Sequence, residues 1–231
     1  MIRCIWIDID NTLLDFDAYV KEALREGFAH FDLGEYNEEV YRVFRPINAS
    51  FWHRLETGEI TYEELLRDRW NTVFEALGIS FDGPTFERYF KARLFDSAIP
   101  VSGAMTLLEH LHCRYLLCVA SNGPYEQQMN RLRLAGMTSY FSHFFISEAV
   151  GASKPSREFF LHGLSVINEG RQTPISPDEI LMIGDSLSSD MAGAKNVGMH
   201  TCLLDRSGAG NAKESFVDYT VHSLEEILKL F

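Results

Sequence analysis

Residues 4–15 read CIWIDIDNTLLD, and the rest of the chain is interpreted from this stretch. Its first half is apolar and rich in β-branched residues, which is typical of a strand buried on both faces. We expect this strand to end in two acids, Asp8 and Asp10, followed by the turn-prone Asn11. Buried carboxylates are costly unless a cation, a proton or hydrogen bonds compensate them. Because open α/β sheets bind ligands at the carboxyl ends of their strands, the stretch predicts a metal-dependent acid site with separate roles for Asp8 and Asp10.

The pair of acids has other interpretations when it is taken alone. Two solvated carboxylates at the end of an ordinary strand would give the same pattern. A calcium loop of the EF-hand type is excluded by spacing, because such a loop needs glycine at its sixth position and glutamate at its twelfth. Counted from Asp8, these positions hold Leu13 and Tyr19.

Length and composition narrow the class of protein. The chain has 231 residues, 46% of them hydrophobic, which allows one large domain or one domain with a substantial insert. No apolar run reaches the roughly 20 residues that span a bilayer, and the sequence from Met1 onward has no signal-peptide pattern. We therefore expect a cytoplasmic protein. The four cysteines form no CxxC pair, which favours free thiols over disulfides or a zinc site.

The net charge restricts the partners that we expect. A formal charge of −12 repels nucleic-acid polymers and anionic membranes, so neither is expected to bind. A small phosphorylated metabolite is still compatible with this charge. The reason is that a bound cation and one local lysine can reverse the sign of the potential inside a site.

Residues 16–97 carry helical patterns and no strand signal. The expected helices cover residues 16–31, 38–56 and 61–77, with a fourth starting at Pro84. The second helix is expected to bend or break near Pro46. The third opens with the capping box Thr-Tyr-Glu-Glu at residues 61–64 and stops at Gly78. This block is therefore predicted to be a helical insert between the first strand and everything after it.

From Pro100 onward, strand and helix patterns alternate. The expected strands are 115–120, 143–147, 180–183 and 201–204, and the expected helices are 103–112, 125–135, 156–167, one through Asp190 and Ala194, and 223–230. A loop rich in glycine and alanine is expected at residues 207–212. Repeated strand–helix units predict an α/β fold, a Rossmann-like parallel sheet with helices on both faces.

Three later stretches carry polar groups that would suit a phosphorylated ligand. Ser121 and Asn122 lie between a strand and the start of a helix, where a hydroxyl and backbone N–H groups can hold phosphate oxygens. Lys154 precedes a proline at another helix start and could neutralise a phosphoryl group. Asp185 ends the apolar run 180–183, and Asp190 follows in the next turn. Taken singly, each stretch could equally be a helix cap or a surface residue.

The combination of these stretches is more informative than any one of them. The carboxyl ends of parallel strands meet at one edge of the sheet, so the acids, the hydroxyl and the lysine should gather there. Acids gathered without a cation would repel one another. A bound Mg²⁺ is therefore the predicted counterpart.

In their order along the chain, these motifs resemble those of the haloacid-dehalogenase-type phosphohydrolases. The matching motifs are Asp8-Ile9-Asp10-Asn11-Thr12, Ser121-Asn122-Gly123, Lys154-Pro155 and Gly184-Asp185-Ser186-Leu187-Ser188-Ser189-Asp190. Within the family, the stretches around the last three motifs are most similar to the pyrimidine 5′-nucleotidase subgroup. The resemblance implies a catalytic α/β core formed by residues 1–15 and 98–231, with residues 16–97 as a helical cap.

The resemblance also implies a role for each motif residue. Asp8 attacks the phosphorus and forms an aspartyl-phosphate, and Asp10 protonates the departing oxygen before it activates water. Mg²⁺ is held by Asp8, by the backbone carbonyl of Asp10 and by Asp185. Asp190 supports this metal shell from outside or joins it through water.

The remaining motif residues are expected to bind the phosphoryl group. The resemblance assigns phosphoryl oxygens to Ser121 and to the backbone of Asn122, and charge compensation to Lys154. Asp10 argues for phosphate esters, because family members that cleave carbon–halogen bonds lack this second acid. We thus expect a hydrolase of small phosphate monoesters, with nucleoside 5′-monophosphates as one candidate class, acting as a monomer or homodimer.

Other functions are compatible with the same motifs. A phosphosugar mutase needs the same core and would return the phosphoryl group to its substrate. A phosphatase acting on sugar phosphates and a non-enzymatic role in binding phosphorylated ligands are further alternatives.

Overall fold

The structure is a computed structural model that describes residues 1–206, 208 and 214–231. The chain divides into two compact units. The α/β unit comprises Met1–Asp15 and Ala98–Phe231, and the helical unit comprises Phe16–Ser97. The loop expected at residues 207–212 lies, apart from Gly208, outside the described residues.

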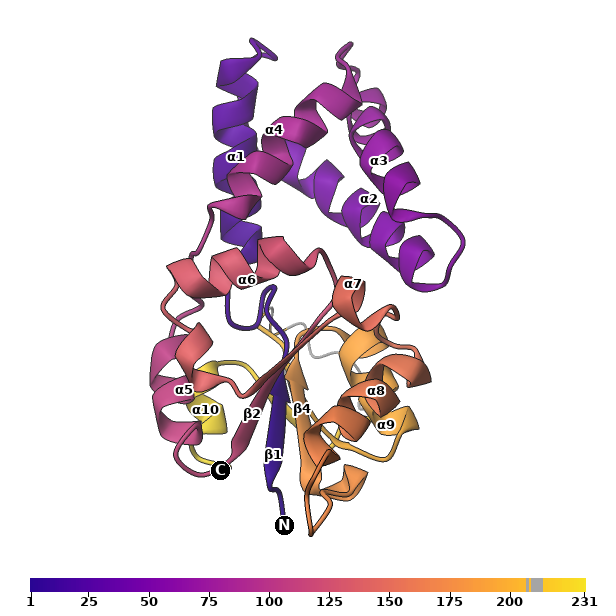
Figure 1. Cartoon of the computed structure of the whole chain (residues 1–231). Coiled ribbons are helices and arrows are strands. Elements are labelled where there is room, and N and C mark those ends of the chain that lie inside the picture. Colours follow the sequence, from indigo (N-terminus) through magenta and orange to yellow (C-terminus); the bar gives the residue numbers. More distant parts are fainter. Residues whose placement is uncertain (207, 209–213) are drawn as a thin grey trace. The chain divides into compact units, whose positions relative to one another are not determined.

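A parallel sheet of six strands forms the centre of the α/β unit, in the order β3-β2-β1-β4-β5-β6. Figure 1 labels its central strands β2, β1 and β4. The strands are β1 (Cys4–Ile7), β2 (Leu116–Ser121), β3 (His143–Ile146), β4 (Ile180–Gly184), β5 (His200–Leu204) and β6 (Tyr219–Val221). β1 lies between β2 and β4, with Ile7 opposite both Val119 and Ile183. The predicted α/β fold is confirmed. β6 was not predicted, because three residues are too few to establish an alternating pattern.

Helices connect the strands, and helices joined by short loops form the helical unit. In the α/β unit they are α5 (Ala104–Leu111), α6 (Tyr125–Leu134), α7 (Ser147–Val150), α8 (Arg157–Asn168), α9 (Ala192–Asn196) and α10 (Leu224–Ile227). Three short helical turns accompany them: η1 (Thr138–Tyr140), η2 (Pro177–Glu179) and the π-helical η3 (Leu187–Met191). The helical unit contains α1 (Phe16–His30), α2 (Glu38–Glu56), α3 (Tyr62–Leu77) and α4 (Gly83–Phe95).

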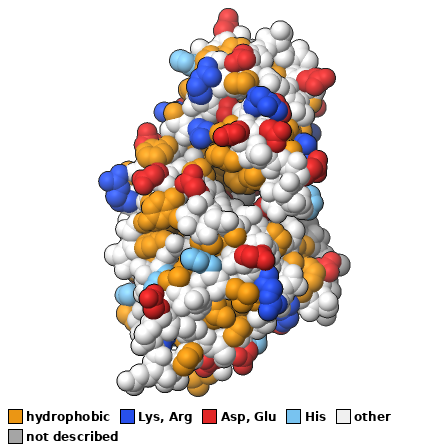
Figure 2. Space-filling view, turned by 45° about the vertical axis from the view of Figure 1, so that its right-hand side comes forward, with side chains coloured by type: hydrophobic (Ala, Val, Ile, Leu, Met, Phe, Trp, Pro, Cys, Tyr) orange, Lys and Arg blue, Asp and Glu red, His pale blue; other side chains and the backbone are white. Residues whose placement is uncertain are grey.

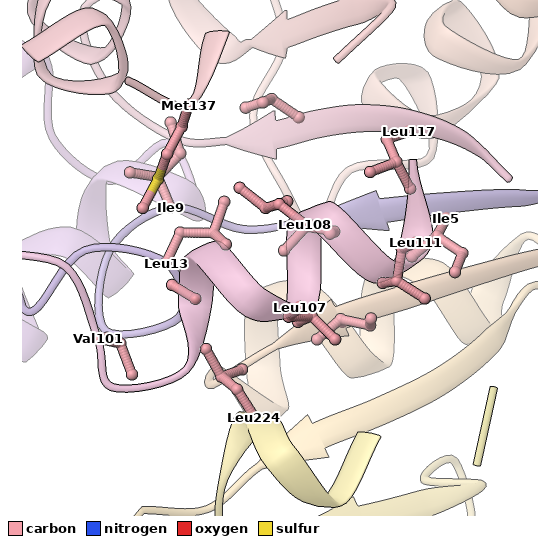
Figure 3. Close-up of a cluster of buried hydrophobic side chains, with 14 of the residues drawn as sticks. Ile5, Ile9, Leu13, Val101, Leu107, Leu108, Leu111, Leu117, Met137 and Leu224 are labelled. Atoms are coloured by element: carbon pink, nitrogen blue, oxygen red, sulfur yellow. The ribbon is translucent and has the colours of Figure 1, made fainter. Parts of the chain in front are cut away.

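Alternate residues of the strands enter two hydrophobic cores, one on each face of the sheet. In β1, Ile5 and Ile7 belong to the core that includes Leu108 of α5, part of which is drawn in Figure 3. Trp6 belongs to the other core, where its ring stacks on that of Phe160 of α8 at a centroid distance of 6.0 Å. Because both faces are covered, β1 must be apolar at every position, which explains its unbroken hydrophobic run.

The helical unit follows its sequence signals closely, with one exception. Thr61 Oγ1 accepts a hydrogen bond from the Glu64 N–H at 3.2 Å, and Glu64 Oε2 accepts one from the Thr61 N–H at 2.8 Å, so the expected capping box is present. A break at Pro46 was the wrong alternative, because α2 continues through the proline. Phe44 and Phe51 are buried on either side of it, and such packing offsets the proline penalty of about 3 kcal/mol.

The surface carries charges of both signs. On the face drawn in Figure 2, basic side chains lie among acidic ones instead of forming one continuous patch. Among the described residues, no helix combines the length and the apolar character needed to cross a bilayer.

Candidate active site

The site is built where three neighbouring strands end. Asp8 directly follows β1, Ser121 is the last residue of β2, and Asp185 directly follows β4. The register aligns these ends, because Ile7 of β1 lies opposite Val119 of β2 and Ile183 of β4. The parallel sheet therefore brings Ser121 and Asp185 to the same edge as Asp8, which lies more than a hundred positions before either of them in sequence.

Lys154 joins the acids of this edge. Its Nζ lies 2.7 Å from Asp8 Oδ1 and 2.6 Å from Asp190 Oδ1, and it donates a third hydrogen bond to the Ala120 carbonyl at 2.8 Å. All three ammonium protons thus have acceptors, and the side chain is only 2% exposed. Burial by itself opposes a charge on Lys154, but the Asp190 and Asp8 carboxylates outweigh this effect, so the pKa of the lysine lies above its ordinary value.

Three carboxylates cluster around this lysine. Asp8, Asp185 and Asp190 each offer an oxygen, and these oxygens lie within 4.8 Å of one another. Burial raises the pKa of Asp8 to about 7, with Lys154 opposing the rise and the charges of Asp190 and Asp10 adding to it. We call Asp8, Asp185 and Asp190 the acid cluster.

Asp185, a second acid of the cluster, is subject to the same repulsion between carboxylates. Desolvation, together with repulsion from Asp8 and Asp190, acts to raise the pKa of Asp185. The residue is nevertheless exposed, so solvent screens much of this effect. One lysine cannot neutralise three acids, and hard divalent cations prefer carboxylate oxygens. The acid cluster therefore fits a Mg²⁺ ion on charge and on donor chemistry.

Asp190 is held by two donors. Its Oδ1 accepts from Lys154, and its Oδ2 accepts from the Ser186 N–H at 3.0 Å. The absence of a side chain at Gly184 makes room for this carboxylate, because a Cβ at that position would lie 2.2 Å from Asp190 Oδ2. Any side chain at Gly184, the last residue of β4, would therefore clash with the Asp190 carboxylate.

Ser121 and Asn122 were predicted to bind phosphate, and the structure gives both further contacts. Ser121 Oγ accepts a hydrogen bond from Gln128 Nε2 at 2.9 Å. The Asn122 amide pairs with the main chain of Lys154 in both directions: Nδ2 donates to the Lys154 carbonyl and Oδ1 accepts from its N–H, each at 2.9 Å. The Asn122 side chain therefore positions the lysine, and the phosphate role predicted for its backbone stays a prediction.

Asp10 lies apart from the acid cluster in its side-chain contacts. Its Oδ1 accepts from Arg131 Nη1 at 2.7 Å and its Oδ2 from Gln128 Nε2 at 2.8 Å. Sequence reasoning missed Gln128 and Arg131. Their spacing of three places them on one face of the helix that starts just after Ser121, and this was the available signal.

Comparisons with known proteins agree with this geometry. The family model described as haloacid dehalogenase-like hydrolase matches residues 2–198. The pyrimidine 5′-nucleotidase PynA of Streptococcus pneumoniae is 33% identical over 233 residues, covering 98% of this chain and 93% of that protein. The pyrimidine 5′-nucleotidase YjjG of Escherichia coli is 28% identical over 228 residues, covering 98% and 96%. Among solved structures, the HAD-hydrolase YfnB of Bacillus subtilis bound to magnesium matches with a TM-score of 0.88 and 28% identity, covering 99% of this chain and 98% of that one.

Proposed function

The chain belongs to the haloacid dehalogenase-like hydrolases, and from this premise we propose that it is a Mg²⁺-dependent phosphohydrolase of small phosphate monoesters. The observation that carries the proposal is the contact of 2.7 Å between Asp8 Oδ1 and Lys154 Nζ inside the acid cluster. A carboxylate held beside a fixed cation is suited to attack a phosphoryl group whose negative charge would otherwise repel it.

The reaction uses Asp8 and Asp10 in turn. A carboxylate oxygen of Asp8 forms a bond to phosphorus while the bond from phosphorus to the leaving oxygen breaks, and Asp10 gives that oxygen a proton. Water then attacks the aspartyl-phosphate and Asp10 takes its proton, so that the acyl-phosphate bond breaks and Asp8 is restored. Ser121 and the backbone of Asn122 hold the phosphoryl oxygens, and the charge of Lys154, whose three protons already have acceptors, offsets the negative charge of the phosphoryl group.

Mg²⁺ would be held by Asp8, Asp185 and the backbone carbonyl of Asp10. Asp190 is assigned a supporting role outside this shell, because its two oxygens already accept from Lys154 and Ser186. When bound, the ion offsets the charge of the carboxylates and of the phosphoryl group.

The substrates proposed first are nucleoside 5′-monophosphates with pyrimidine bases. PynA and YjjG, the relatives that support this choice, are pyrimidine 5′-nucleotidases that align with nearly the whole chain. The helical unit Phe16–Ser97 is assigned the role of the cap that selects the leaving group.

Purified protein tests the proposed function directly. We expect release of inorganic phosphate from pyrimidine nucleoside monophosphates when Mg²⁺ is present, and loss of this release when the ion is chelated. The same panel should contain purine nucleoside monophosphates and sugar phosphates, with product analysis to detect a phosphosugar mutase. Interconversion of sugar phosphates without net phosphate release would favour the mutase. No Mg²⁺-dependent release from any ester would contradict the proposal.

Binding of Mg²⁺ should depend on pH in a defined direction. Because the pKa of Asp8 is raised to about 7, a proton competes with the cation below this pH. The pKa of Asp185 is raised as well, so we expect the affinity for Mg²⁺ to increase with pH, by about tenfold or more per pH unit below pH 7. Calorimetric titration in buffers of different ionisation enthalpy measures both the affinity and the released proton. Asp185→Asn should weaken binding, and an affinity that falls with rising pH would refute the assignment.

A further inference from the structure

Two buried side chains of α6 grip the Asp10 carboxylate. Arg131 Nη1 donates to Oδ1 at 2.7 Å, and Gln128 Nε2 donates to Oδ2 at 2.8 Å. Since each oxygen of the carboxylate has its own donor, rotation of the carboxylate plane about its bond to Cβ is restricted. A single donor would restrain that rotation less.

The two donors are also fixed relative to each other. Arg131 Nη1 donates to Gln128 Oε1 at 2.9 Å, and this bond orients the Gln128 amide so that its Nε2 points to Asp10 and to Ser121 Oγ, which lies at 2.9 Å. Gln128 and Arg131 are each 1% exposed, whereas the Asp10 side chain is 33% exposed. Gln128 and Arg131 are therefore fixed in the packed interior, whereas the Asp10 carboxylate that they hold is accessible to solvent.

We propose that Gln128 and Arg131 are positioning residues that place the Asp10 carboxyl for proton transfer to the leaving oxygen. This inference rests on the proposed function, because it assigns Asp10 the role of acid and base. Proton transfer requires a distance and direction within hydrogen-bond reach, and a misplacement of about 1 Å can cost about 100-fold in rate. Burying the Arg131 guanidinium costs desolvation free energy that an apolar side chain would not cost. A positioning role gives this arginine a function beyond packing.

The test compares two kinds of phosphate ester in kcat/KM. This parameter covers the steps up to departure of the leaving group, so it excludes the later hydrolysis that all substrates share. An alkyl ester needs a proton on its departing oxygen, whereas a nitrophenyl ester departs as a stable anion. A variant with a misplaced Asp10 should therefore lose much more activity on the alkyl ester.

We expect Arg131→Met and Gln128→Met to lower kcat/KM for the alkyl ester by about 100-fold and for the nitrophenyl ester by less than about tenfold. Arg131→Lys keeps a donor and a positive charge, so it should recover part of the loss on the alkyl ester. The matched control is Arg133→Met, because Arg133 lies on the same helix but is exposed and bonds to Asn130. It should leave both esters unchanged.

The possible outcomes distinguish a failure of the positioning role from a failure of the proposed function. Equal losses on both esters, or no loss on either, would overturn the positioning role while leaving the phosphohydrolase intact. A wild-type protein that turns over neither ester would instead contradict the proposed function itself. If Arg131→Met does not fold, Gln128→Met and Arg131→Lys provide the same comparison of esters.

Discussion

Asp8→Asn is expected to abolish turnover, with a fall in kcat on the order of 10⁴-fold or more. The amide has nearly the same shape as the carboxylate, but it cannot form the aspartyl-phosphate. It also removes one negative charge from the acid cluster. Phosphate release under saturating substrate measures the loss, and trapping of a phosphorylated protein should succeed with the wild type alone. Ordinary activity in the variant would refute the assigned nucleophile.

The same substitution should not unfold the protein. Folding raises the pKa of Asp8 from an ordinary 3.8 to about 7, so the folded state binds this proton more tightly than the unfolded state does. Ionisation of Asp8 therefore lowers the free energy of unfolding as pH rises from about 4 to 7, and this loss of stability is complete above pH 7. At pH 8 without a divalent cation, we expect the thermal midpoint of Asp8→Asn to equal or exceed that of the wild type. Asp178→Asn, an exposed change outside the site, is the matched control for activity.

Lys154→Met is expected to lower kcat by about 10³-fold. Methionine fills a similar volume, but it removes the cation that contacts both Asp8 and Asp190. Without it, Asp8 loses the donor that orients it, and the attack must proceed against the uncompensated charge of the phosphoryl group. Steady-state kinetics with a nucleoside monophosphate measures the effect, which should fall on kcat more than on KM.

The lysine variant should also be less stable, unlike the Asp8 variant. Asp8→Asn leaves Lys154 paired with Asp190, whereas Lys154→Met leaves both buried carboxylates without a cation. Removing the shared partner in this way costs about 3 kcal/mol in the free energy of unfolding. Lys154 stays charged near neutrality because its pKa is raised, but the pKa of Asp8 is about 7. The loss should therefore be larger above pH 7, where Asp8 is ionised, than below it. Urea unfolding measures it. Lys195→Met, which breaks the exposed pair with Asp218, should cost no more than about 1 kcal/mol. Equal costs for the two variants would contradict the buried pairing.

Local patterns predicted most elements because each depends on its own residues. The capping box at Thr61 lies where its spacing indicated, and the unbroken apolar run of β1 does mark a strand covered on both faces. The break considered at Pro46 was wrong, because packing of Phe44 and Phe51 decides the course of α2 and no local signal reports that packing. Gln128 and Arg131 were missed for a related reason. Their spacing of three indicates only that they share one face of a helix, and their burial is what reveals their role.

The groups that meet could be predicted from the sequence, because Asp8, Ser121 and Asp185 end or follow parallel strands and the carboxyl ends of such strands share one edge. The pairs of atoms that form at that edge depend on how the elements pack. Lys154 reaches Asp8 across 146 positions of sequence and Arg131 reaches Asp10 across 121. Which partners pair over such distances depends on the direction in which packing holds each side chain. That direction cannot be predicted from the spacing of residues in the sequence.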